Sequence, residues 1–365
     1  MPSTSRRLAF IPERAVEPPL RILAVGDSYM PPRYFSEAFA DLAQFHDIEL
    51  MQIDASRAFE PMTPSERKLR EYQGSPAELV ERMPGIDVLV VQGAPVTDQV
   101  LDASSRLRLV CCARGGPVNV DVDAVNARRL PLVTTPGKNA EAVADLTLAF
   151  MVMIARQLPK AQRFLADGHQ VHDNWEGARF IGNDLRRHAL GIVGYGEIGR
   201  RVAHRALSFG MSILVYDPYV VVPAGSGVMQ VETFGELLGG SDFVSLHARA
   251  TSENANLIDA AALASMKRGA CLVNTARETL IDEDALDAAL SSGQLAGAAL
   301  DVVRGTAGDG PNRLLRHDNV VVTPHVGGAT HETLFQAGEM IAADIVRFSE
   351  GIAPLNVFNG GAVLA

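Results

Sequence analysis

The stretch Ala189-Leu-Gly-Ile-Val-Gly194-Tyr-Gly196-Glu-Ile-Gly199-Arg decides the fold of this chain. It joins an apolar run typical of a buried strand to a Gly-x-Gly-x-x-Gly turn, and Arg200–Phe209 continues it with helical spacing. In such a turn Gly194 would permit the tight bend, Gly196 would let the backbone approach a pyrophosphate, and Gly199 would allow close helix packing. The pattern predicts a strand, a turn and a helix that form one half of a dinucleotide site.

The cofactor of this site is predicted from the residues around the glycines. A pyrophosphate would lie at the helix N-terminus, where free N–H groups and the helix dipole favour anions. The next apolar run ends at Asp217, whose carboxylate would accept hydrogen bonds from ribose hydroxyls and repel a 2′-phosphate, which favours NAD over NADP. Two alternatives stay open: a glycine-rich turn without a ligand, and an Asp217 that only starts the turn before Pro218.

Length and charge limit the class of protein. The chain has 365 residues, 47% hydrophobic and 21% charged, a globular mixture long enough for two domains. The formal net charge of -10 disfavours nucleic acid or an anionic membrane surface as partner, because both need clustered positive charge. Cys111, Cys112 and Cys271 lie in apolar runs and fit a reducing cytoplasm. The start, Ser5-Arg-Arg-Leu8, resembles an export signal but lacks its apolar segment, and Leu146–Ala155 is too short to span a bilayer.

Strand-like and helix-like segments alternate along both halves of the chain. The predicted strands are Arg21–Val25, Ile48–Gln52, Asp87–Val91, Leu107–Cys111, Leu132–Thr134, Ala189–Val193, Ser212–Tyr216, Phe243–His247, Ala270–Asn274, Ala296–Asp301 and Asn319–Thr323. Helical spacing marks Tyr34–His46, Ser75–Arg82, Asn139–Gln157 and His331–Phe348. The alternation predicts an α/β protein with two Rossmann-like or flavodoxin-like parallel sheets, each covered by helices on both faces. We expect a dinucleotide domain at 138–326, inserted into a domain of residues 1–137 and 327–365.

Polar side chains follow three of the later predicted strands. Arg277, Asp301 and His325 each lie at or just past a strand end, so they should meet at one edge of the sheet. Arginine can clamp a carboxylate and polarise a carbonyl, histidine can exchange a hydroxyl proton, and Asp301 could hold a nicotinamide carboxamide. Taken singly, Arg277 could be a surface ion-pairing residue and His325 a loop histidine. Together, behind a dinucleotide fold, they predict hydride chemistry.

These motifs resemble the D-isomer-specific 2-hydroxyacid dehydrogenase family, which includes phosphoglycerate dehydrogenases and glyoxylate/hydroxypyruvate reductases. The resemblance spans residues 21–357 and also rests on Leu107–Asp121 and Thr135–Asp145. It implies an NAD-dependent enzyme that acts on a small D-2-hydroxy or 2-keto acid. It further implies a homodimer joined through the nucleotide-binding domains, with residues 158–188 as the dimer arm.

The resemblance also implies roles for individual residues. Arg277 would bind the substrate carboxylate and keto oxygen, His325 would be the acid/base, and the backbone amides of Gly115 and Gly116 would cradle the carboxylate. The residues implied for the NAD site are Gly194, Tyr195, Gly196, Glu197, Ile198, Gly199, Asp217, His247, Thr275, Ala276 and Asp301.

One position departs from the family pattern. After Asp301 the family has Asp-Val-Phe-x-x-Glu-Pro, with the Glu as third catalytic residue, and Thr306 occupies that position here. Threonine has no charge with which to stabilise an imidazolium. Reduction of a keto acid needs protonated His325, so we expect it to weaken as pH rises past about 7. Asp309, in a glycine-rich loop, is a candidate substitute carboxylate.

The missing Glu leaves a second function open, an NAD(H)-binding sensor or interaction protein with weakened catalysis. Hydride transfer from formate or phosphite is a weaker third possibility, because the extra substrate residues of those enzymes are not evident. Arg114 and Arg249 could favour a phosphorylated or sugar-derived acid, or could ion-pair on the surface. No Cys/His/Asp/Glu cluster has metal-ligand spacing, so we expect no metal.

Overall fold

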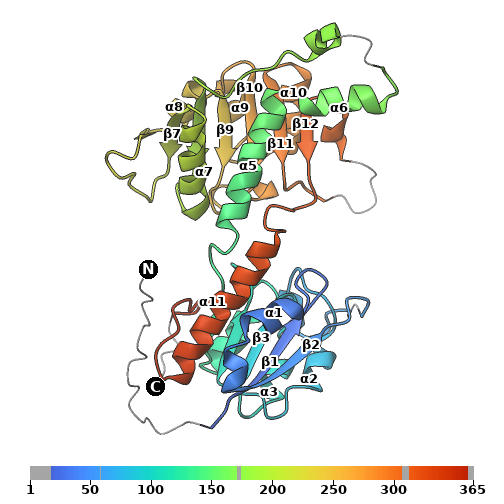
Figure 1. Ribbon diagram of the computed structural model, residues 1–365, viewed down its shortest axis with the longest axis vertical. Helices are drawn as coiled ribbons and strands as arrows, with labels where there is room; N and C mark the ends of the chain where they lie inside the picture. The colour runs from blue at the N-terminus through green and yellow to red at the C-terminus, as the bar shows by residue number, and fades with distance from the viewer. Residues whose placement is uncertain (1–17, 58, 171–173, 306–311, 361–365) are drawn as a thin grey trace, which may run out of the picture. The chain divides into compact units, whose positions relative to one another are not determined.

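The computed structural model describes residues 18–57, 59–170, 174–305 and 312–360 (Figure 1). It divides into two compact units, Met1–Lys138 with Leu334–Ala365, and Asn139–Thr333. Both units are α/β structures on parallel sheets, as the sequence predicts. The expected domain boundaries, after residues 137 and 326, differ from these divisions. The later boundary shifts because the loop Thr323–Gly327 is hydrogen-bonded to Asp301 and therefore remains with the strands of the second unit.

The first unit has a five-stranded parallel sheet with the order β2-β1-β3-β4-β5. This flavodoxin-like order reverses the direction of chain crossover between β1 and β3. The strands are β1 (Arg21–Gly26), β2 (Asp47–Gln52), β3 (Val88–Val91), β4 (Leu109–Cys112) and β5 (Leu132–Val133). The helices are α1 (Arg33–Ala38), η1 (Leu42–Gln44), η2 (Glu66–Lys68), α2 (Pro76–Val80), α3 (Asp98–Asp102), α4 (Val122–Ala127) and, from the end of the chain, α11 (His331–Ser349).

The second unit has a seven-stranded parallel sheet with the order β12-β11-β10-β9-β6-β7-β8. Its strands are β6 (Ala189–Val193), β7 (Ser212–Tyr216), β8 (Val228–Gln230), β9 (Phe243–Leu246), β10 (Ala270–Asn274), β11 (Leu295–Leu300) and β12 (Val320–Val322). Its helices are α5 (Ala140–Ala155), α6 (Leu158–Ala166), η3 (Asn174–Phe180), α7 (Glu197–Ser208), α8 (Phe234–Gly240), α9 (Ala260–Ser265), η4 (Glu278–Leu280), α10 (Glu283–Ser291) and η5 (Arg313–Arg316). The crossovers reverse between β6 and β9, as in a doubly wound dinucleotide fold.

Each sheet is covered on both faces by an apolar cluster. In the first unit α1 and α11 cover one face, and α2, α3 and α4 cover the other. In the second unit α5 and α7 lie side by side across one face (Figure 1), while α8, α9 and α10 cover the other. Continuous buried runs such as β3 and β9 are typical of strands enclosed on both faces. The loops at the strand ends are therefore the accessible part of each sheet.

Ion pairs lock α5 and α7 together beside the glycine turn. Arg205 on α7 pairs with Asp145 on α5 at 2.7 Å and with Glu141 at 2.5 Å. Arg201, one turn earlier, pairs with the same Glu141 and with Glu197 at the helix start. The network fixes the helix whose N-terminus would receive the pyrophosphate.

Some predicted elements differ in the structure. Tyr34–His46 is not one helix, because α1 ends before Phe39 and η1 follows it. The tighter 3₁₀ turn brings Phe39 and Leu42 into the same core. The helix predicted to start at Arg200 begins at Glu197 instead. Strand β8 has no counterpart in the prediction.

The segment between α5 and β6 is an irregular arm, formed in its described part by α6 and η3. Leu165, Trp175 and Ile181 expose large apolar side chains there, and Trp175 is 81% exposed. None of the described helices is, by itself, both long and apolar enough to cross a membrane. Among the described helices, only α5 and α6 reach that length and composition together, as a pair bent by 67°.

Candidate functional site

The predicted site residues of the second unit follow six neighbouring strands. His325 lies after β12, Asp301 after β11, Thr275–Arg277 after β10, His247 after β9, and the glycine turn after β6, with Asp217 after β7. Because all six strands are parallel, these residues share the carboxyl edge of the sheet. The glycine turn and His247 flank the point where the crossovers reverse, which is where ligands bind in open α/β sheets.

The glycines of the turn meet the needs predicted for them. Gly194 has φ +94°, a left-handed conformation, and a Cβ there would lie 2.7 Å from the Ala248 backbone nitrogen. A Cβ on Gly199 would collide with the Gly194 carbonyl oxygen. At Gly196 a Cβ would meet nothing within 4 Å, so open space lies above that backbone. The turn is thus packed closely against the protein at Gly194 and Gly199 and faces open space at Gly196, as a site for a pyrophosphate requires.

The start of α7 fits an anionic ligand. Gly196 occupies the N-cap and makes no side-chain hydrogen bond to the first turn. The amides of Glu197, Ile198 and Gly199 therefore have no cap from this position, and such orphan donors with the helix dipole favour an anion. The Tyr195 side chain is buried, so it is the backbone of this residue that faces the turn. These features fit the diphosphate of a dinucleotide.

Two alanine substitutions separate the roles of these glycines. Gly199→Ala is expected to lower the melting temperature by roughly 10 °C or more, because its Cβ collides with fixed backbone. Gly196→Ala is expected to leave the melting temperature unchanged and to weaken NADH binding at least about tenfold, because its Cβ occupies the cradle. Thermal unfolding and NADH fluorescence titration measure both effects. Equal melting temperatures for the two variants would contradict the packing role of Gly199.

Asp217 ends β7 and holds the glycine turn. Its Oδ2 accepts from the Tyr195 backbone nitrogen at 2.7 Å, and its Oδ1 accepts from those of Tyr219 and Val220 at 2.8 and 3.1 Å. A carboxylate offers about four acceptor positions, so one remains for a ligand hydroxyl. Asp217 therefore caps its own turn and also binds the glycine loop.

His247 follows β9 and lies under the glycine turn. Its Nε2 is 2.8 Å from Ser245 Oγ, and its backbone nitrogen donates to the Val193 carbonyl at 2.8 Å. Its Nδ1 is buried without a partner among the described residues. Burial lowers the pKa of His247 to about 3, so the ring is neutral at physiological pH. His247 thus approaches the glycine turn through its backbone, while its neutral side chain bonds to Ser245.

Acid should destabilise the chain through His247. Because its pKa is about 3 in the folded state and about 6.5 when unfolded, the unfolded chain binds the extra proton. The contribution of His247 to the free energy of unfolding is fully present above pH 6.5. As the pH drops below 6.5, this contribution decreases by at most about 1.4 kcal/mol per pH unit. Urea unfolding between pH 7.5 and 5 measures the slope. His247→Gln, which keeps a partner for Ser245, should flatten it, and an unchanged slope would assign the effect elsewhere.

The loop after β10 is set by a buried asparagine. Asn274 Oδ1 accepts from the Ala276 nitrogen at 3.0 Å, and its Nδ2 donates to the Arg277 carbonyl at 2.9 Å. Thr275 Oγ1 lies 3.1 Å from Thr147 Oγ1 on α5. Arg277 is thereby displayed as an exposed side chain, and its guanidinium donates to the Ala276 carbonyl at 2.7 Å.

The loop after β12 carries His325 as an exposed residue with φ +55°. Its backbone nitrogen donates to the Asp301 carbonyl at 2.9 Å. Both carboxylate oxygens of Asp301 accept hydrogen bonds from this loop. Among the residues that the structure describes, none hydrogen-bonds to the imidazole. Thr306 and Asp309, the two positions that bear on its missing partner, lie outside the described residues.

The glycines predicted to cradle a carboxylate lie in the first unit, at the carboxyl end of β4. Gly115 and Gly116 are exposed, and a Cβ on Gly116 would meet nothing within 4 Å. Neither amide donates a backbone hydrogen bond to another described residue. Arg114 is ion-paired with Glu71, which favours the alternative in which this arginine forms a surface ion pair. Arg249 is exposed and has no carboxylate partner in the described part of the chain.

Lys138 lies beside the exposed glycine pair, although the sequence indicated it only as part of a turn. Its Nζ donates to the Ala113 carbonyl at 2.7 Å, next to Arg114 and the glycine pair. Burial lowers the pKa of Lys138 to about 8, with Arg114 also lowering it. Asn274 and Ser245 were likewise missed as supports. Asn274 bonds to backbone groups, which carry no sequence signature, and Ser245 bonds to the imidazole of His247.

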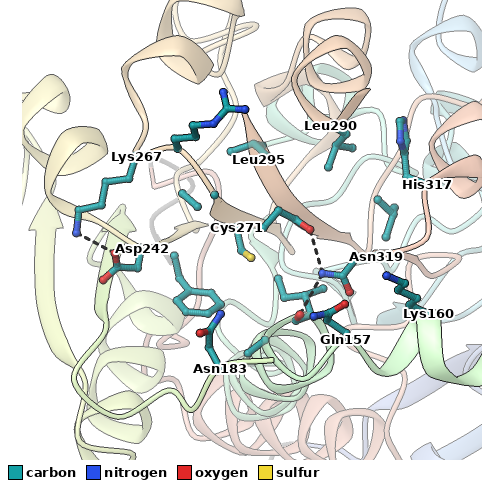
Figure 2. Close-up of a pocket in the computed structure, with 18 of the residues that line it drawn as sticks. Gln157, Lys160, Asn183, Asp242, Lys267, Cys271, Leu290, Leu295, His317 and Asn319 are labelled. Carbon is teal, nitrogen blue, oxygen red and sulfur yellow. Dashed lines mark hydrogen bonds and ion pairs between the residues drawn. The ribbon is translucent and has the colours of Figure 1, made fainter. Parts of the chain in front are cut away.

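A cavity of about 490 Å³ lies at the opposite, amino edge of the seven-stranded sheet. Figure 2 shows Cys271 at the start of β10, with Leu295 of β11 and Asn319 beside it. Asp242 there pairs with Lys267 at 2.9 Å. No predicted site residue lines this cavity. The described residues contain no cluster of three His, Cys, Asp or Glu side chains arranged for a metal ion.

A doubly wound sheet with a glycine turn, a strand-ending acid and this carboxyl-edge set is the architecture of a dinucleotide-binding protein. The model of the D-isomer specific 2-hydroxyacid dehydrogenase NAD binding domain matches residues 148–327. A glyoxylate reductase of Korarchaeum cryptofilum is 37% identical, over 77% of this chain and 85% of its own length. The chain belongs to the D-isomer specific 2-hydroxyacid dehydrogenase family.

Other relatives agree with this placement. A D-3-phosphoglycerate dehydrogenase of Methanocaldococcus jannaschii is 38% identical over 77% of this chain and 53% of its own length. The chain thus spans about half the length of the phosphoglycerate dehydrogenases it matches. The solved TT0316 protein of Thermus thermophilus superposes with a TM-score of 0.72 at 31% identity, covering 93% of this chain and all of that one.

Proposed function

We propose that this protein is an NAD-dependent oxidoreductase that interconverts a small D-2-hydroxy acid and its 2-keto acid. The observation that carries the proposal is the carboxyl edge of the second unit, where the glycine turn, Arg277 and His325 follow alternate strands of one parallel sheet, β6, β10 and β12. The names of relatives, glyoxylate reductase and phosphoglycerate dehydrogenase, support the same reaction class. A nicotinamide bound at this edge would supply or accept the hydride.

Each polar residue has a distinct part in this proposal. Arg277 binds the substrate carboxylate and polarises the keto oxygen, because a guanidinium presents paired donors in one plane. His325 gives a proton to the keto oxygen in reduction, which makes it a hydroxyl, and takes a proton from that hydroxyl in oxidation. Gly115 and Gly116 of the first unit have exposed amides, a kind of backbone donor that can bind an anion such as a carboxylate. Ala276 and Thr275 line the cofactor through the loop that Asn274 fixes.

We further propose NAD as the cofactor rather than NADP. Asp217 has one acceptor position left beside the glycine turn, and its charge would repel a 2′-phosphate. Asp217→Ser is therefore expected to raise the ratio of kcat/KM for NADPH to that for NADH at least about 30-fold. Asp259→Ser, at the N-cap of α9, is the control and should leave the ratio unchanged. A wild-type enzyme that prefers NADPH would overturn the assignment.

A second candidate is an NAD(H)-binding sensor of the same fold with weakened catalysis. Thr306 at the usual Glu position favours it. One experiment separates the two: NADH consumption and thermal shift over a panel of short-chain and sugar-derived 2-keto acids, with and without phosphate groups. Turnover with any of them supports the dehydrogenase. Tight NADH binding without turnover supports the sensor.

The remaining inferences concern assembly and compartment. The exposed Leu165, Trp175 and Ile181 of the arm support a homodimer in which these side chains are covered by a second copy. Analytical sedimentation at micromolar concentration tests the dimer by comparing the molecular mass of the wild type with that of Trp175→Ser.

The three cysteines are free and buried, which supports a reducing, cytoplasmic setting. The partners we propose are thus the acid substrate and a second copy, with no nucleic acid or membrane.

A further inference from the structure

Asp301 is almost completely buried at the end of β11, and its carboxylate is occupied by the loop after β12. Oδ1 accepts from Thr323 Oγ1 at 2.6 Å and from the Val326 nitrogen at 2.8 Å. Oδ2 accepts from the Gly327 nitrogen at 2.7 Å. The Asp301 backbone carbonyl also accepts from the His325 nitrogen. One residue thus binds the loop before, at and after His325.

The conformation of His325 requires such restraint. Its φ of +55° is in the left-handed region, which side chains with a Cβ rarely occupy. A residue remains there only where its surroundings over-determine the backbone. The hydrogen bonds from Thr323 on one side and from Val326 and Gly327 on the other supply that restraint.

We propose that Asp301 is a positioning residue, whose carboxylate fixes the Thr323–Gly327 loop in the conformation that presents His325. The proposal rests on the acid/base role proposed for His325. It differs from a nicotinamide-carboxamide contact, because the Asp301 carboxylate is almost completely buried and both of its oxygens already accept from the loop. Hydrogen bonds to an ionised acceptor are about twice as strong as neutral ones, so the carboxylate suits this task.

Close packing at Gly327 also supports the positioning role of Asp301. A Cβ there would lie 2.7 Å from Asp301 Oδ2, although its backbone needs no left-handed conformation. Glycine is required at this position because the carboxylate approaches the backbone. Gly327→Ala therefore displaces the carboxylate without changing any charged or hydrogen-bonding group. At the next residue, Gly328, the nearest neighbour of a Cβ is the Asn139 side chain at 3.1 Å, which can move.

The first test uses steady-state kinetics with the keto acid turned over best. Thr323→Val, which removes one bond to Asp301, and Gly327→Ala should each lower kcat about 10–100-fold, with KM and the Kd for NADH within about twofold of wild type. Thr323→Ser and Gly328→Ala are the matched controls and should keep kcat. If the Kd for NADH rises and kcat does not fall, the carboxylate serves the cofactor and the proposal is overturned.

The second test needs no substrate or cofactor. Hydrogen–deuterium exchange of a peptide that covers residues 322–328 should be at least about tenfold faster in Thr323→Val and Gly327→Ala than in wild type and the two controls. Faster exchange throughout the second unit, with a lower melting temperature, would instead indicate a general structural role and overturn the proposal. Since this readout is independent of turnover, it decides the role of Asp301 even if no 2-keto acid is reduced and the proposed function fails.

Discussion

Replacement of His325 by Asn is expected to lower kcat for 2-keto acid reduction by about 10²–10⁴-fold, the usual contribution of a general acid. Asparagine tolerates the left-handed backbone that His325 adopts at φ +55°, so the loop keeps its shape and only the proton donor is lost. The Kd for NADH should not change, because the proposed dinucleotide site, the glycine turn, follows a different strand. Stopped-flow reduction with saturating NADH measures the rate.

The control is His204→Asn, since His204 is exposed on α7 and away from the strand ends. It should retain wild-type kcat. A His325→Asn enzyme that keeps more than about a tenth of the wild-type rate would remove His325 from the acid/base role. The proton would then have to come from another group.

The second large effect is expected at Arg277. Arg277→Lys should lower kcat/KM for the keto acid by about 10²–10³-fold, because one ammonium cannot reproduce two parallel donors to a carboxylate and the carbonyl beside it. Among the described residues, no carboxylate pairs with Arg277, so its charge is available to a substrate. Steady-state kinetics with the same keto acid measures the loss.

A matched arginine lies at the other end of the same sheet. Arg268 is exposed at the amino edge, just before β10, and Arg268→Lys should leave kcat/KM unchanged. Unchanged NADH binding in both variants would show that the fold and the dinucleotide turn are intact. If Arg277→Lys loses less than about threefold, substrate recognition must reside elsewhere, for example in Arg249.

The fold was predictable where strands are buried on both faces. Ala189–Val193, Ser212–Tyr216 and Ala270–Asn274 have the predicted ends, because glycine or polar residues at or next to the ends of an apolar run leave little ambiguity. Strand β8 could not be predicted, since it is a short edge strand whose Met229 is 60% exposed. The break after Phe39 depends on tertiary packing, which local spacing does not encode.

The site was predictable in its residue types and incompletely in its contacts. The order of strand-ending residues placed Arg277 and His325 at one edge, because parallel strands end together. The occupation of Asp301 by Thr323, Val326 and Gly327 depends mostly on backbone amides more than 20 residues away in sequence. Backbone amides are present at nearly every residue, so the pattern of side chains does not predict which amides will bind a given carboxylate.

The discontinuity of the first unit has a consequence for biosynthesis. The second unit is one uninterrupted segment, Asn139–Thr333, whereas the first needs Leu334, Ala337 and Ile341 of α11 to complete a face of its core. During translation the first five strands therefore leave the ribosome long before the helix that covers them. The second unit, although it follows the first in sequence, is therefore the first that can complete its hydrophobic core on the nascent chain. One face of the first sheet stays uncovered until α11 has been synthesised.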